Sequence, residues 1–149
     1  MATFTEDPPT TGFDALAYGE LIHLARTATL HEQAWLALEA AHVVGQRHLK
    51  PHLETHALML GLALRTGDWA EAAGQLFRLA LVPLGHVTGR LPLGNPGRAT
   101  VSAFRPLPVR PELVALIKQA GAGGLTSSDP DPPIRPERAR TQGSRSRGA

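Results

Sequence analysis

The chain has 149 residues, a formal net charge of +2 and no cysteine, and this length fits one domain with a sizeable apolar core. The absence of cysteine excludes disulfides, thiolate metal sites, iron–sulfur clusters and a cysteine nucleophile. The excess charge falls from Gly121 onward, where five arginines face three acidic residues, so the preceding part is neutral and gains little support as a nucleic-acid binder.

Residues 1–12 form a polar, proline-rich segment that we expect to be a flexible arm. The segment lacks a basic start followed by an apolar stretch, which a secretory signal requires. No apolar run approaches the roughly 18 residues of a membrane span, and the lack of cysteine fits a reducing compartment. We therefore expect a cytoplasmic protein without a membrane partner.

Two helices are predicted next, over residues 13–28 and 31–44, because apolar residues recur there at helical spacing. Gly45 is the expected C-terminal cap of the second helix. The first buried stripe is Phe13, Leu16, Ala17, Leu21 and Leu24, and the second is His31, Trp35, Leu38 and His42.

A third helix is predicted over residues 48–66, with Pro51 in its first turn and Gly67 at its end. Its expected buried stripe is Leu49, Leu53, Ala57, Leu60 and Leu64. A fourth is predicted over residues 69–82, after the capping pair Asp68 and Glu71, and is expected to end at Pro83. Its expected buried face is Trp69, Ala72, Ala73, Leu76 and Ala80.

Short gaps between consecutive helices favour antiparallel neighbours, and the turn at residues 67–69 is similar in style to tetratricopeptide helical pairs. Residues 83–110 are rich in glycine and proline, so we expect an extended segment packed along the helices. A short helix over residues 111–120 closes the predicted domain, residues 13–120. Residues 121–149 are expected to be a disordered tail. The predicted fold is all-α, built from antiparallel helix hairpins.

Four of the seven histidines lie between positions 42 and 56. His48, His52 and His56 are each four residues apart, so their rings form one slowly drifting stripe on the third helix. His42 lies on the inner stripe of the preceding helix, and the short turn returns the chain beside it. These four residues are the candidate metal ligands, while His23, His31 and His86 stand apart and are assigned structural or surface roles.

Neutral imidazoles at this spacing suit Zn²⁺, Cu²⁺, Ni²⁺ or Fe²⁺, and Met59 would favour copper if it reached the ion. Glu39 is the nearest acidic side chain that could support His42. The alternative interpretation is structural: the histidines cap, fill the hairpin interface and donate to backbone carbonyls.

Other motifs give weaker signals. The stretch LPLGNPGR lacks the lysine and the following helix of a phosphate loop, so it indicates a turn. Arg98 and Arg105 are expected in surface or packing roles. No pair of carboxylates has the arrangement of a general acid and base, so an enzyme is the third hypothesis, after a metal-binding protein and a metal-free module that binds a protein partner.

Three stretches, AHVVGQRHLKPHLETHALML, RTGDWAEAAGQLFRL and GRLPLGNPGRATVSAFRPLP, carry a resemblance to a known family. The chain resembles the small bacterial family catalogued as domain of unknown function 3703. The resemblance covers residues 13–120 and departs only at the first turn, RTATLHEQAW. The resemblance implies a helical fold and an association with metal resistance, but it implies no established activity. The four clustered histidines are part of the family pattern.

Overall fold

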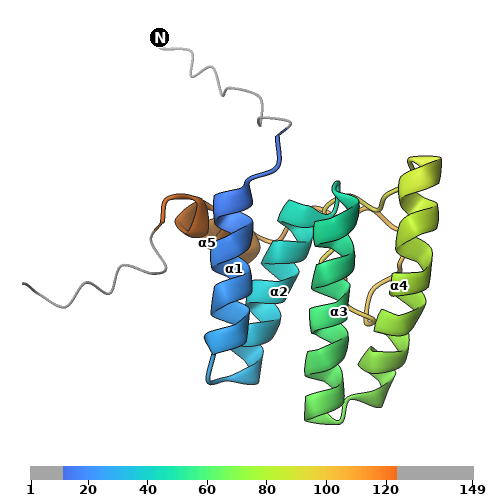
Figure 1. Ribbon diagram of the computed structural model, residues 1–149, viewed down its shortest axis with the longest axis horizontal. Coiled ribbons are helices and arrows are strands. Elements are labelled where there is room, and N and C mark those ends of the chain that lie inside the picture. The colour runs from blue at the N-terminus through green and yellow to red at the C-terminus, as the bar shows by residue number, and fades with distance from the viewer. Residues whose placement is uncertain (1–11, 124–149) are drawn as a thin grey trace, which may run out of the picture.

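The computed structural model describes residues 12–123, which form five α-helices and no strand. The helices are α1 (Ala15–Thr27), α2 (His31–Gly45), α3 (Leu49–Thr66), α4 (Trp69–Thr88) and α5 (Pro111–Gly121). Figure 1 shows α1 to α4 side by side with alternating direction, and α5 against α1 and α2. The predicted all-α fold of antiparallel hairpins with an extended C-terminal segment is thus confirmed. The predicted flexible arm and disordered tail lie almost wholly outside the described residues.

Asp68 and Gly67 act as the predicted caps, whereas Gly45, the predicted cap of α2, is its last helical residue and is followed by Gln46 with φ of −60°. Asp14 is a further cap, outside the predicted set. The Asp14 carboxylate accepts from the backbone N–H of Ala17 at 2.9 Å, and Asp68 accepts from that of Glu71 at 3.0 Å. Each side chain satisfies a backbone donor that the first helical turn leaves without a partner. Within residues 12–123, none of the helices combines the length and apolar character that crossing a membrane would need.

The fourth helix is longer than predicted. It passes through Pro83 and ends at Thr88, with Gly89 as its C-cap at φ of 67°. A proline inside a helix removes one hydrogen bond, but the turn beyond it packs at Gly85 against Leu91 of the following segment. This extra turn carries His86, which the sequence pattern places apart from the other histidines.

The apolar core lies among α1, α2 and α5, with a contribution from the middle of α3. Its fully or nearly fully buried members are Ala17, Tyr18, Leu21, Ile22, Ala34, Leu38, Ala40, Ala41, Met59, Leu62, Leu113 and Ala120. Burial of this apolar surface is the main term that favours folding. Leu16, expected in the same stripe, is instead 56% exposed.

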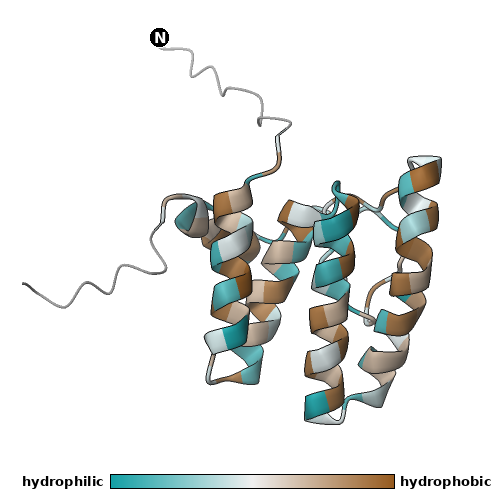
Figure 2. Cartoon of the chain, in the orientation of Figure 1, coloured by the Kyte–Doolittle hydropathy of each residue, from teal (hydrophilic) through white to brown (hydrophobic). Residues whose placement is uncertain are grey.

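The predicted buried faces of α3 and α4 are wrong at most positions: only Ala72 is buried, and Leu53 and Leu60 are half-buried. About half of the surface of Leu49, Leu64 and Leu76 is exposed, and Trp69 is more exposed still. The interior face of α3 is made of His52, Thr55, His56, Met59, Leu62 and Ala63, and that of α4 of Glu71, Ala72, Gln75, Arg78 and Val82. Figure 2 shows hydrophilic residues in teal at the start of α3, where Lys50 is exposed and His52 is buried.

The extended segment, residues 89–110, explains the polar face of α4. It lies against α2 and α4 as irregular backbone, whose carbonyl and N–H groups need partners when buried. Gln75 donates to the Gly97 carbonyl at 2.9 Å, and Arg78 donates to the Arg98 carbonyl at 2.6 Å. Glu71 accepts from the Ala99 N–H at 2.9 Å. The polar side chains of α4 therefore face inward because irregular backbone lies beside them, whereas His52 and His56 of α3 face His42 of α2 and Gln75 of α4.

Asn95 is the fully buried residue that holds the extended segment together. Its side-chain amide donates to the carbonyls of Ser102 and Arg105 at 2.8 and 3.0 Å, and its side-chain oxygen accepts from Gly97. Gly94 has φ of 77°, and a Cβ there would lie 1.9 Å from the Leu107 carbonyl oxygen. The sequence LGNPGR is thus a specialised turn, as predicted, with its asparagine as the internal tie.

Candidate metal centre

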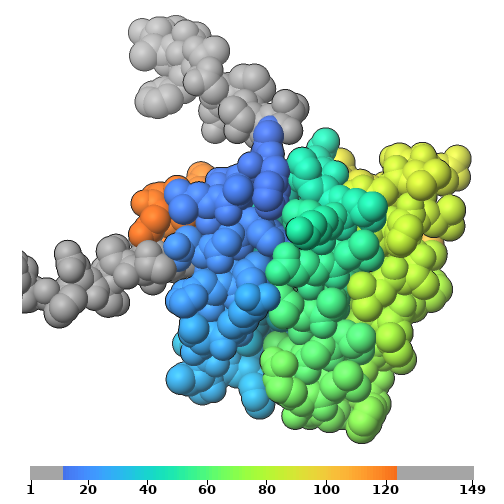
Figure 3. Space-filling model, viewed as in Figure 1, coloured from blue at the N-terminus to red at the C-terminus, as the bar shows by residue number. Residues whose placement is uncertain are grey.

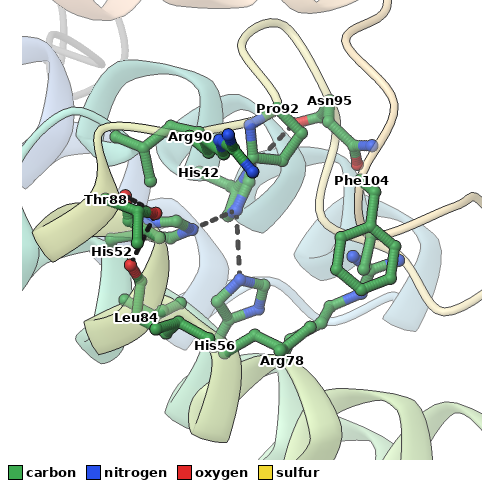
Figure 4. A pocket seen from close by; sticks show the side chains of 15 residues that line it. His42, His52, His56, Arg78, Leu84, Thr88, Arg90, Pro92, Asn95 and Phe104 are labelled. Atoms are coloured by element: carbon green, nitrogen blue, oxygen red, sulfur yellow. Dashed lines mark hydrogen bonds between the residues drawn. The ribbon is translucent and has the colours of Figure 1, made fainter.

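Three buried histidines converge between α2 and α3. His42 of α2 and His52 and His56 of α3 are each at most 3% exposed. The Nε2 atom of His42 lies 3.0 Å from Nε2 of His52 and 3.2 Å from Nε2 of His56 (Figure 4). Ligand nitrogens of the three residues lie within 4.8 Å of one another. Metal–nitrogen bonds near 2.1 Å place two nitrogens of a tetrahedral site about 3.4 Å apart, so these three fit one ion with small shifts.

The outer nitrogen of each ring is held by a hydrogen-bond partner. His42 Nδ1 donates to the Asn95 carbonyl at 2.8 Å, and His56 Nδ1 donates to the Gln75 side-chain oxygen at 2.7 Å. The Gln75 amide donates in turn to Glu71 and to the Gly97 carbonyl, which fixes its orientation. Outer partners of this kind orient the histidines of metal sites and set which nitrogen carries the proton.

These bonds leave Nε2 of His42 and of His56 without protons. Two nitrogen lone pairs then face each other across 3.2 Å, an arrangement that is repulsive unless a cation lies between them. His52 can place its proton on Nδ1 and donate to His86 Nε2, 3.1 Å away. In that state all three Nε2 lone pairs point toward one centre.

Burial keeps the three rings neutral. It lowers the pKa of His42 well below its ordinary value, and the neighbouring His56 and His52 lower it further. Burial, with His56 next, lowers the pKa of His52 to about 3, and burial lowers that of His56 to about 4 although its bond to Gln75 opposes this. Near neutral pH the imidazoles are therefore in the form that coordinates a metal.

Three of the four predicted ligands come together, and the fourth does not. His48 precedes the first turn of α3 with extended backbone and packs its ring 4.9 Å from that of Phe13. His86 of α4 is the histidine that the prediction missed, and it contacts His52 from outside the cluster. His86 was missed because the helix was predicted to end at Pro83, although Gly89, three residues after His86, is a C-cap signal.

Two supporting roles in the prediction are also wrong. Glu39 forms ion pairs with Arg98 and Arg110, while the Asn95 carbonyl supports His42. Met59 belongs to the apolar core. Arg98 has the packing role expected of it, because its guanidinium stacks 3.9 Å from the centre of the Trp35 ring.

A cavity of about 290 Å³ opens on one side of the three histidines. The second half of α4 and the segment after it form its walls, and Figure 4 shows Leu84, Thr88, Pro92 and Phe104 around its mouth. An ion bound by the three Nε2 atoms would therefore keep a coordination position open toward this cavity, as an exchangeable or catalytic site requires.

Comparisons with known proteins identify a family but no characterised relative. No curated protein and no solved structure matches the chain. Residues 16–117, which include the three converging histidines and the extended segment, match the family described as "Protein of unknown function (DUF3703)". The match covers well over half of the chain, and the protein therefore belongs to the DUF3703 family.

Proposed function

We propose that this protein is a cytoplasmic accessory protein that binds one transition-metal ion through Nε2 of His42, His52 and His56. The observation that carries the proposal is the surplus of lone pairs: two deprotonated nitrogens lie 3.2 Å apart with their outer nitrogens already bonded. A purely structural cluster would alternate donors with acceptors. Here a cation is the missing partner.

The donor set narrows the choice of ion. Three neutral imidazoles without thiolate or carboxylate suit Zn²⁺, Cu²⁺, Ni²⁺ or Fe²⁺, and they disfavour Mg²⁺ and Ca²⁺, which prefer oxygen. Among divalent ions, Cu²⁺ is expected to bind most tightly to such a site. The association with metal resistance that the family resemblance implied would fit such a protein, and it stays a prediction.

Calorimetric titration of Zn²⁺ and Cu²⁺ into the purified protein tests the proposal. One ion per chain should bind to the natural protein, and the His52→Ala/His56→Ala variant should lose that binding. The matched control, His23→Ala/His31→Ala, removes two exposed histidines and should change nothing. Absent binding, or equal binding in all three proteins, would remove the metal site.

A second candidate function is a metal-free module that binds a protein partner. Apolar side chains lie exposed along the outer side of α4 and at the adjoining loop: Trp69, Leu76, Phe77, Leu84, Val87 and Phe104. The rings of Phe77 and Phe104 lie edge to face with centres 6.3 Å apart. A contiguous exposed apolar surface of this kind is typical of interaction sites.

The two candidates predict opposite behaviour toward a chelator. A partner that docks on the α4 surface should be retained when metal is removed and when His52 and His56 are replaced. It should be lost in a Trp69→Ser/Phe77→Ser variant that still binds metal. Retention of the partner by that variant would remove this second candidate.

A further inference from the structure

The cavity beside the three histidines has an unusual charge composition. Two arginines and the three histidines line it, and the remaining lining residues among those described are apolar or uncharged, without any carboxylate. An ion in the histidine cluster would add two positive charges to the same space. A cavity with such an excess of positive charge and apolar walls requires an anion to neutralise it.

Arg78 is the buried cation of this cavity. It is 6% exposed and acts electrostatically on all three histidines. Its Nη2 donates to the carbonyls of Arg98 and Val101, but within residues 12–123 no carboxylate lies at ion-pair distance from it. In Figure 4 its side chain runs along the cavity below Phe104.

Arg98, a half-buried arginine nearby, differs from Arg78 in having acidic partners. Arg98 pairs with Glu39 at 3.2 Å and with Glu71 at 3.1 Å. Glu71 is also the acid that acts on Arg78 electrostatically, yet its oxygens are taken by Gln75, Ala99 and Arg98. The charge of Arg78 is therefore left for a ligand that enters the cavity.

We propose that the cavity binds a small organic carboxylate, which takes the open position on the metal and pairs with Arg78. This inference rests on the proposed metal site. The carboxylate neutralises charge, and its hydrocarbon part lies among Leu81, Val82 and Leu91. An inorganic oxyanion fits less well, because a phosphate needs many donors to replace its water shell and these walls offer few.

The test uses the protein loaded with Co²⁺, whose visible absorption reports changes at the metal. Acetate, hexanoate and inorganic phosphate are titrated separately. Hexanoate should bind about 10- to 100-fold more tightly than acetate, since its four extra methylene groups leave water, and phosphate should bind most weakly. Arg78→Gln should weaken hexanoate binding about tenfold or more without changing the amount of Co²⁺ bound, and Arg78→Lys should restore part of it.

Two controls separate the ligand site from the metal site. Arg90→Gln removes an exposed charge at the cavity and should weaken hexanoate binding much less than Arg78→Gln does, because solvent screens that charge. Ala103→Leu should weaken hexanoate more than acetate by filling apolar space. A cobalt spectrum that does not respond to hexanoate, or responds equally in the Arg78→Gln variant, overturns the carboxylate site alone. If the protein gives no cobalt spectrum at all, the metal site itself is wrong and the carboxylate site falls with it.

Discussion

The two halves of the molecule are filled in different ways. Between α1, α2 and α5 the interior is almost wholly apolar. Between α3, α4 and the extended segment it also holds histidine, glutamine, arginine, glutamate and asparagine side chains joined by hydrogen bonds. Figure 3 shows the two halves side by side, α1 and α2 in blue and α3 and α4 in green and yellow.

The difference teaches how a small helical protein can combine stability with a polar site. Apolar burial contributes free energy without strict geometry, and volume-conserving changes there are tolerated. A buried polar network contributes little net stability but is costly when one partner is removed. We therefore expect the first half to control the free energy of unfolding and the second half to control metal affinity.

The largest effect on stability is expected from Leu21→Ala in the apolar half. Leu21 is fully buried in the core, and removal of such a side chain costs about 2–5 kcal/mol through lost burial and the cavity left behind. Urea unfolding measures the loss. Leu16→Ala is the control, because Leu16 is 56% exposed on the same helix and should change stability by less than about 0.5 kcal/mol.

The comparison becomes sharper if metal binding is measured on the same variant. The folded fraction of Leu21→Ala should bind Zn²⁺ with unchanged affinity, because two of the three ligands lie in the other half and Asn95 of the extended segment holds the ring of the third, His42. A large drop in affinity at a temperature where the variant remains folded would show that the two halves are not separable.

The next effect is expected from Gln75→Leu in the polar half. The substitution removes the acceptor of the His56 ring and two donations, to Glu71 and to the Gly97 carbonyl. Loss of a ligand's outer partner typically lowers metal affinity about 10- to 100-fold. Zn²⁺ titration against a competing chelator measures this. Gln33→Leu, at an exposed position of α2, is the matched control and should leave affinity unchanged.

These two halves also differ in how far the sequence predicts them. Helical periodicity and capping residues such as Asp68 and Gly67 are local, so helix number and most helix ends could be predicted. Which face is buried depends on the neighbour. On α4 the sequence favoured Trp69 and Leu76 as interior residues, yet the neighbour is extended backbone that needs polar partners. Periodicity alone carries no such information.

The site shows the same limit. His42, His52 and His56 could be predicted from spacing within helices and a short turn. His48 has the same spacing, but it has extended backbone, with φ of −118° and ψ of 119°, so the helical rotation that aligns the others does not apply to it. The tie from Asn95 to His42 joins residues 53 positions apart, and no local pattern indicates it.

A pH dependence should distinguish the polar half in the metal-free protein. Burial lowers the folded-state pKa of His52 to about 3 and of His56 to about 4, from an ordinary value of 6.5. Between pH 6.5 and 4 the unfolded chain therefore binds more protons than the folded protein does. The contribution of the two neutral rings to stability is present above pH 6.5 and is lost as pH falls toward 4. Urea unfolding from pH 8 to 4 should show this decline.

The control for the pH effect is the His52→Ala/His56→Ala variant, in which the decline between pH 6.5 and 4 should be shallower. It keeps His42, so part of the slope should remain. An identical slope in both proteins would mean that other groups cause the acid sensitivity and that these rings are not held neutral by burial.

The smallest effect is expected where the two halves meet, at Tyr18. Its hydroxyl lies 3.0 Å from the Pro51 carbonyl and 3.1 Å from the Thr55 hydroxyl, so Tyr18→Phe should cost about 1 kcal/mol at pH 7 and leave Zn²⁺ affinity unchanged.

Burial raises the pKa of Tyr18 to about 12. Its neutral form therefore stabilises the fold below pH 10, and this contribution is lost as pH rises toward 12. Urea unfolding from pH 7 to 11 should show the two proteins converging in stability at the alkaline end, because the phenylalanine variant has no such contribution to lose; a constant difference would mean that the hydroxyl is not buried at this junction.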